Sequence, residues 1–172
     1  MDLSPVAGSR LESTTELVGL LDVRSFFSEG RGVSSPRRLV QEAAARGYRA
    51  LALTDDLSVG GVVELQQNAA AAGIAAIVGA TVPLRTAAGV YPVVLLCSAR
   101  QGYQNLCELI TLCRYGRQEA VTMAQLAELA GDLHLLTGGR SGFPSQLLAA
   151  RRPRRLEELL QELRRVMAER LY

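Results

Sequence analysis

Short apolar runs alternate with longer amphipathic segments along most of this chain. The runs have the length of buried strands and lie at residues 17–23, 50–54, 74–78, 90–96 and 133–137. Segments with helical spacing of apolar positions lie at residues 36–46, 61–72, 101–114 and 154–170. Strands that alternate with helices predict βαβ units and an α/β fold with mostly parallel strands. The pattern alone leaves a closed barrel and an open sheet as alternatives.

Local signals mark where several of these helices begin and end. Ser35 followed by Pro36 is typical of a helix start, and Gly47 stands where that helix would stop. Thr122, with Gln125 three residues later, predicts a short helix that opens with a capping box. These signals favour separate short helices between the strands.

Composition and charge limit the function classes. The chain has 172 residues, 48% of them hydrophobic and 21% charged, which is typical of one globular domain. The net charge is only +2, so we expect weak or no direct binding to nucleic acid. For the basic block Arg151–Arg155, a solvated loop competes with a contact to phosphate or to an acidic partner. Further possible surface contacts are Arg31, Arg37, Arg38 and Arg49.

The chain ends and the cysteines suggest a compartment. Residues 1–16 mix small, polar and charged side chains, which predicts a flexible leader before a domain at residues 17–172. No apolar run is long enough for a signal peptide or a membrane span, so no membrane partner is expected. Three cysteines without paired spacing argue against disulfides and zinc, and favour the reducing cytoplasm.

Common catalytic motifs are missing from the sequence. It contains no phosphate-binding loop, dinucleotide fingerprint or nucleophile elbow. His134 is the one histidine, and it lies inside an apolar run, which predicts a core or barrel-lining residue. Cys97 follows a strand, where a structural thiol competes with a nucleophile.

Three aspartates follow predicted strands. Asp22 ends the first strand, and Asp55 and Asp56 follow the second. If these strands are parallel neighbours, their carboxylates meet at one rim, where oxygen ligands could hold Mg²⁺ or Mn²⁺. The alternative is structural: Asp55 or Asp56 caps the following segment, and Asp22 pairs with an arginine such as Arg24.

Longer stretches of the chain carry a family resemblance. They are Leu21–Ser28, Gly32–Val40, Gly47–Asp55, Ala72–Ala80, Gly102–Ile110 and Leu133–Gly138. In order and spacing they resemble the PHP (polymerase and histidinol phosphatase) domain that opens bacterial DNA polymerase III alpha subunits, both replicative and error-prone. The resemblance implies a distorted (β/α)7 barrel with a metal cluster at its C-terminal rim.

The metal motifs of that family are degenerate here. The corresponding positions are Asp22, Arg24, Asp55, Asp56, Thr81 and Pro92. The His-x-His pair reads Asp22 and Arg24, and the histidine of the Thr-Asp-His motif is Asp56. Thr81 replaces the glutamate of a Gly-x-Glu motif, and Pro92 replaces a further histidine.

These departures imply a domain without a metal cofactor. One histidine cannot supply the imidazoles that such a cluster needs, and Arg24 brings a permanent cation to the site. We expect Arg24 to occupy the place of the ions and to pair with Asp22, Asp55 or Asp56. The alternative is Mn²⁺, Mg²⁺ or Zn²⁺ held by Asp22, Asp55 and Asp56.

The resemblance implies a non-catalytic structural and docking domain of a DNA polymerase III alpha-type system, with no activity of its own. Expected partners are other domains or chains of a polymerase, among them a proofreading exonuclease. The alternatives are a residual metal-dependent phosphoesterase or 3′–5′ exonuclease that uses the aspartates, and a stand-alone adaptor.

The barrel is expected to be incomplete, because the family's last ligand motif would fall after Tyr172. The sequence does not tell a fragment from a split gene or a relic. Open strand edges would favour self-association or pairing with another chain.

Overall fold

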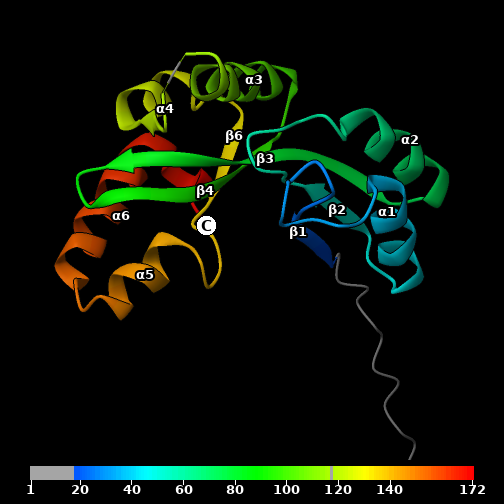
Figure 1. Cartoon of the computed structure of the whole chain (residues 1–172), viewed down its shortest axis with the longest axis horizontal. Coiled ribbons are helices and arrows are strands. Elements are labelled where there is room, and N and C mark those ends of the chain that lie inside the picture. Colours follow the sequence, from blue (N-terminus) through cyan, green and yellow to red (C-terminus); the bar gives the residue numbers. More distant parts are fainter. Residues whose placement is uncertain (1–17, 117) are drawn as a thin grey trace, which may run out of the picture.

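The computed structural model describes residues 18–116 and 118–172, and it has the predicted α/β architecture (Figure 1). The strands are β1 (Gly19–Val23), β2 (Ala50–Leu53), β3 (Ala75–Thr86), β4 (Gly89–Cys97), β5 (Val121–Thr122) and β6 (Leu133–Leu136). The helices are α1 (Pro36–Ala45), α2 (Val62–Ala72), α3 (Arg100–Arg114), α4 (Met123–Leu129), α5 (Phe143–Ala149) and α6 (Pro153–Met167), followed by the 3₁₀ turn η1 (Ala168–Arg170). The predicted leader at residues 1–16 lies outside the described residues.

The strands form one sheet in the order β1-β2-β3-β4-β6, with β5 added beside β3. The pairs β1–β2, β2–β3 and β3–β5 are parallel, whereas β3–β4 and β4–β6 are antiparallel. Within the described residues, the outer strands β1 and β6 do not pair with each other. The barrel is therefore open, as expected for an incomplete PHP-type barrel.

Strand β3 is longer than the sequence pattern predicted. We expected a strand that ends at residue 78, but β3 continues to Thr86 and forms a hairpin with β4. Its first part pairs with β2, and from Gly79 onward it pairs with β4. In the second part, the buried residues Ala80, Val82 and Leu84 alternate with less buried ones, as expected for a strand. Pro83 lies inside this part, and a proline in a sequence pattern argues against a strand.

The predicted start and stop signals of several helices are confirmed. The Ser35 hydroxyl accepts a hydrogen bond from the Arg38 backbone N–H, and Thr122 and Gln125 form the capping box. Gly47 and Gly73 adopt positive φ values just after α1 and α2. Two elements were not predicted from the sequence pattern, the strand β5 and the helix α5.

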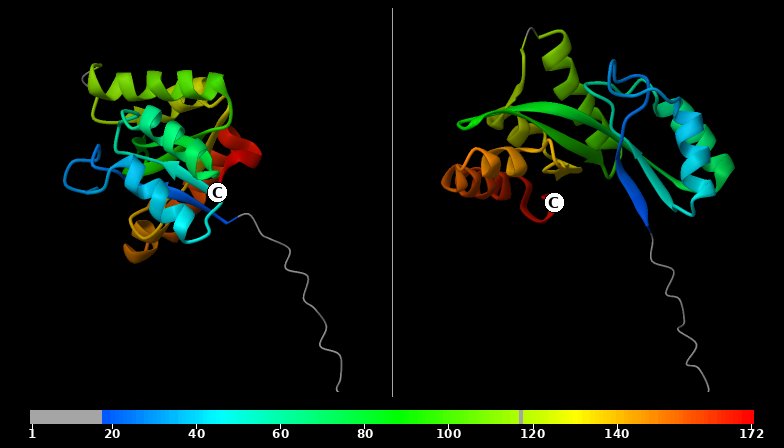
Figure 2. Two further views of the ribbon diagram at one scale, coloured as in Figure 1. Left: turned by 90° about the vertical axis from the view of Figure 1, so that its right-hand side faces the viewer. Right: turned by 60° about the horizontal axis from the view of Figure 1, so that its bottom comes forward.

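Two groups of helices cover the sheet, and Figure 2 shows them at opposite ends of its arch. Helices α1 and α2 bury Leu51 and Leu53 of β2 together with Val40 and Leu65. Ala52 points to the other face of β2 and packs with residues of β4 inside the open barrel. A larger core joins the β3–β4 hairpin and β6 to helices α3 to α6. Among the residues described, no helix combines the length and apolar content of a bilayer span.

Gly79 allows β3 to change partners. A Cβ atom at this position would lie 2.6 Å from the Leu95 carbonyl oxygen and 2.7 Å from a Leu96 methyl group. Both distances are shorter than a carbon atom tolerates, and the carbonyl belongs to the backbone of the paired strand. Only glycine therefore fits where β3 passes from β2 to β4.

Gly79→Ala should lower the free energy of unfolding by about 1–3 kcal/mol, because the added methyl group forces the two strands apart. Gly139→Ala is the matched control, since a Cβ atom there meets nothing within 4 Å. Urea unfolding of both variants checks the expectation. Equal stability of the two variants would contradict the crowding at Gly79.

Candidate functional site at the strand ends

The predicted rim exists, because β1 and β2 are parallel neighbours and β3 continues the parallel arrangement. Asp22 lies in the last part of β1, and Arg24 follows that strand. Asp55 and Asp56 follow β2, and Thr81 lies beside them on β3, where it pairs with Asp56. The structure thus brings together five of the six positions that correspond to the family's metal motifs.

Arg24 is the centre of this cluster. Its Nη1 donates to Asp22 Oδ1 at 3.1 Å, and its Nε donates to Asp56 Oδ1 at 3.3 Å. Its Nη2 donates to Thr81 Oγ1 at 2.9 Å. The side chain is 22% exposed, so solvent screens these ion pairs only in part. One guanidinium group therefore connects the ends of β1 and β2 to β3.

Two threonines extend the cluster below Arg24. Thr81 Oγ1 donates to the Thr54 carbonyl oxygen at 2.9 Å, and Thr54 Oγ1 donates to Asp22 Oδ1 at 3.0 Å. On the solvent side, Arg31 Nη1 lies 3.5 Å from Asp56 Oδ2. The carboxylates of Asp22 and Asp56 thus each have an arginine partner, as the structural alternative predicted for Asp22.

Asp55 has a different environment from its neighbour. It is fully buried, and its Oδ1 accepts hydrogen bonds from the Ser25 backbone N–H at 2.7 Å and from Ser28 Oγ at 2.6 Å. Its Oδ2 accepts from Ser25 Oγ at 2.7 Å. These donors compensate the loss of hydration of a buried carboxylate. Asp55 therefore fastens the loop after β1 to the end of β2, and it does not pair with Arg24.

The loop at residues 25–34 has little freedom where it meets Asp55. Ser28 Oγ also accepts from the Asp56 backbone N–H at 3.0 Å, and a Cβ atom on Gly32 would lie 1.8 Å from the Ser25 carbonyl oxygen. Sequence reasoning did not identify Ser25 and Ser28 as site residues. Their spacing after a strand resembles many polar loops, so only the fold reveals their common partner.

Pro92 and His134 lie apart from the arginine cluster. Pro92 is inside β4 and pairs with Pro83, two residues along the hairpin from Thr81. His134 is half-buried in β6, pairs with Leu96, and has its ring 5.8 Å from that of Tyr172. Since Leu96 pairs with Gly79, His134 lies across β4 from β3. It lines the open barrel, as predicted.

The side chains at the rim do not fit a metal cluster. Among the described residues, no group of three or more His, Cys, Asp or Glu is placed to hold a metal ion. Asp22 borders a hollow of about 240 Å³ inside the open barrel, but its other walls include Val94, Leu136 and Tyr172, which are poor ligands. Arg24 further adds a fixed positive charge between the two half-exposed carboxylates.

Cys97 behaves as a structural thiol. Burial, together with the neighbouring Cys107, raises the pKa of the Cys97 thiol to about 12. The thiolate form that would act as a nucleophile is therefore scarce near neutral pH. This environment favours the structural role over the nucleophile for Cys97.

Asp55→Ala should cost about 2–3 kcal/mol of stability, because it leaves buried donors of Ser25 and Ser28 without an acceptor. Asp55→Asn is the matched variant, and it should cost less since it keeps one acceptor oxygen. Chemical unfolding measures both. A loss below about 0.5 kcal/mol for Asp55→Ala would contradict the anchoring role.

The chain is similar in sequence to one protein family and to several named proteins. The model of the PHP domain family matches residues 21–172. Proteins named error-prone DNA polymerase are similar: one from Bordetella parapertussis is 41% identical over 124 residues, covering 69% of this chain and 12% of that protein. One from Ralstonia nicotianae is 41% identical over 119 residues, covering 66% and 11%. The chain thus spans about an eighth of the length of these relatives.

A solved structure shares the fold. It is a two-domain protein from Bacteroides vulgatus that contains a predicted PHP-like metal-dependent phosphoesterase. The TM-score is 0.52 at 19% identity, and the match covers 74% of this chain and 37% of that one. With the family match over residues 21–172, the chain belongs to the PHP domain family and is related to error-prone DNA polymerases.

Proposed function

We propose that this chain is a metal-free, non-catalytic structural and docking domain of a cytoplasmic DNA polymerase III alpha-type system, active in replication or translesion synthesis. One observation carries the proposal: the Arg24 guanidinium binds Asp22, Asp56 and Thr81 at the rim where the family resemblance implies metal ions. A cation of the protein itself neutralises the remaining carboxylates.

The side chains that could act as metal ligands at the rim support a site without catalytic activity. Catalytic metal clusters of this kind combine several imidazoles with carboxylates that have free lone pairs. Here the single histidine lies on another part of the sheet, and Asp55 accepts three hydrogen bonds in a fully buried position. A phosphoesterase or exonuclease that uses the three aspartates would have to break these contacts first.

The docking role is supported by the relatives and by the open sheet. The match covers only 12% of a relative named error-prone DNA polymerase, which supports other domains or chains of a polymerase as partners. A proofreading exonuclease is the further partner that we propose. Strand β1 lies at an edge, and its Leu21 is 42% exposed. An open edge with an exposed apolar side chain favours pairing with another polypeptide, and self-association is the alternative.

The purified chain should not change its melting temperature when Mn²⁺, Zn²⁺ or EDTA is added, because Arg24 already satisfies the carboxylates of Asp22 and Asp56. Metal content by mass spectrometry should be far below one ion per chain. Ligands that bind only the folded state raise its stability, so binding would be visible as a shift.

Stoichiometric metal, with a stabilisation that EDTA removes, would contradict the proposal. It would favour the residual metal-dependent phosphoesterase. The same metal measurements are made on the Arg24→Ala variant. This substitution removes the guanidinium group between Asp22 and Asp56 and adds no metal ligand.

A further inference from the structure

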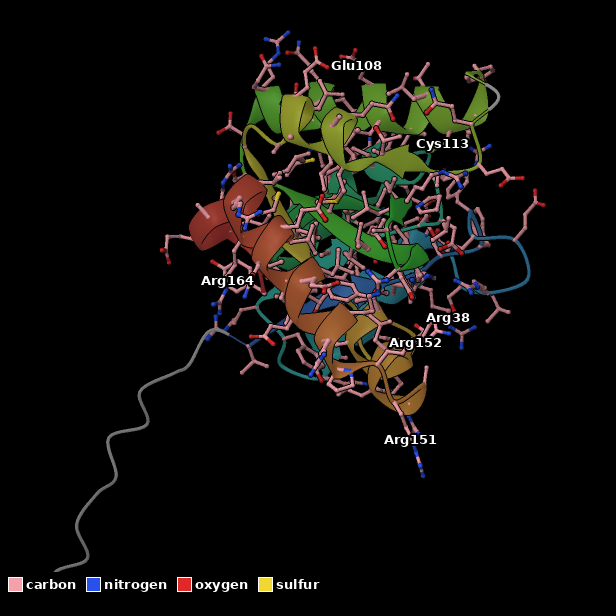
Figure 3. The ribbon with its side chains drawn as sticks, turned by 90° about the vertical axis from the view of Figure 1, so that its left-hand side faces the viewer. Arg38, Glu108, Cys113, Arg151, Arg152 and Arg164 are labelled. Carbon is pink, nitrogen blue, oxygen red and sulfur yellow. The ribbon has the colours of Figure 1, made fainter. Side chains whose placement is uncertain are left out.

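Four arginines gather at the turn between α5 and α6. Arg151, Arg152, Arg154 and Arg155 surround Pro153, and all five residues are exposed. Together they line an open hollow of about 630 Å³. Figure 3 shows Arg151 and Arg152 at this corner, while Arg164 lies toward the other end of α6. We call the four arginines the elbow patch.

The elbow patch is strongly positive although the whole chain is nearly neutral. Residues 133–156 contain five arginines and no aspartate or glutamate. Within the part of the chain that the structure describes, Arg155 pairs with Glu158 at 3.2 Å, and the other three arginines of the patch have no carboxylate within 4.0 Å. Three exposed guanidinium groups therefore remain available to a ligand.

Local helix stability does not account for these arginines. Arg151 has a φ of +55°, a conformation that favours glycine after a helix. Arg152 caps α6 without a side-chain hydrogen bond, and the first turn of α6 contains no acidic residue. Arginines at a helix start oppose the helix dipole. By contrast, Arg164 and Arg165 lie in the last turn of α6, where the dipole favours cations.

We propose that the elbow patch binds the phosphodiester backbone of a nucleic acid. Arginine binds phosphate through two parallel hydrogen bonds, and exposed cations gain affinity by releasing the counterions of the strand. An acidic protein would need an apolar interface core beside the charges. The one large apolar side chain of α5 and α6 that is largely exposed is Leu148. A phosphate backbone therefore matches the elbow patch better.

This contact goes beyond the docking role and does not depend on the metal-free rim. Figure 1 shows α5 and α6 at the lower left of the molecule, whereas β1 and the loop that follows it lie right of its centre. Contacts to phosphate carry no sequence information, so the binding should be independent of sequence. The elbow patch would add a local contact to nucleic acid that the small net charge of the whole chain does not predict.

The test compares two double variants that each remove two exposed arginines, one variant at the start of α6 and the other in its last turn. Arg152→Ser with Arg154→Gln changes the elbow patch, and Arg164→Gln with Arg165→Gln is the control. Fluorescence anisotropy with labelled single-stranded and duplex DNA is measured at several salt concentrations. We expect the elbow variant to bind at least about tenfold more weakly at low salt, with a salt slope smaller by about 1.5. The control should stay within about twofold.

Arg151→Gly separates binding from folding. Glycine relieves the positive φ, so the variant should melt at the same or a higher temperature while it binds DNA more weakly. Three results would overturn the proposal: no DNA binding at low salt, an equal loss in the control variant, or equally tight and patch-dependent binding of polyglutamate. The last would indicate an acidic protein. None of these three results affects the metal-binding measurement that tests the proposed function, so the two proposals can fail separately.

Discussion

The guanidinium group of Arg24 holds the rim of this domain together. It contacts Asp22 on β1, Asp56 after β2 and Thr81 on β3, and so joins three neighbouring strand ends. Without a cation between them, Asp22 and Asp56 would leave two carboxylates facing one another at the end of parallel strands. In this PHP domain an arginine of the chain itself supplies that charge.

The rest of the fold brings these groups into register. Gly79 lets β3 leave β2 and pair with β4, which sets Thr81 two residues later beside Asp56. Asp55 fastens the loop after β1 through Ser25 and Ser28, and this loop also carries Arg31 toward Asp56. The anchoring and the charge compensation are therefore separate tasks of two adjacent aspartates.

The sequence was sufficient for the parts that depend on local signals. Apolar periodicity and capping residues such as Ser35 and Thr122 located most elements, and the parallel β1–β2 pair followed from their alternation with helices. The full length of β3 could not be predicted, because it depends on pairing with β4 across a proline. The burial of Asp55 was equally invisible, since its serine partners lie 27 and 30 residues away and only the fold joins them.

The unfolding free energy of the triple variant Asp22→His, Arg24→His and Asp56→His tests the central claim most directly. Measured in urea with chelator, it should fall by about 1–2 kcal/mol, because the partly buried ion pairs disappear. The control Glu42→His with Arg46→His removes an exposed pair on α1 and should cost at most about 0.5 kcal/mol. If the triple variant is as stable as the unmodified chain, Arg24 does not stabilise the rim.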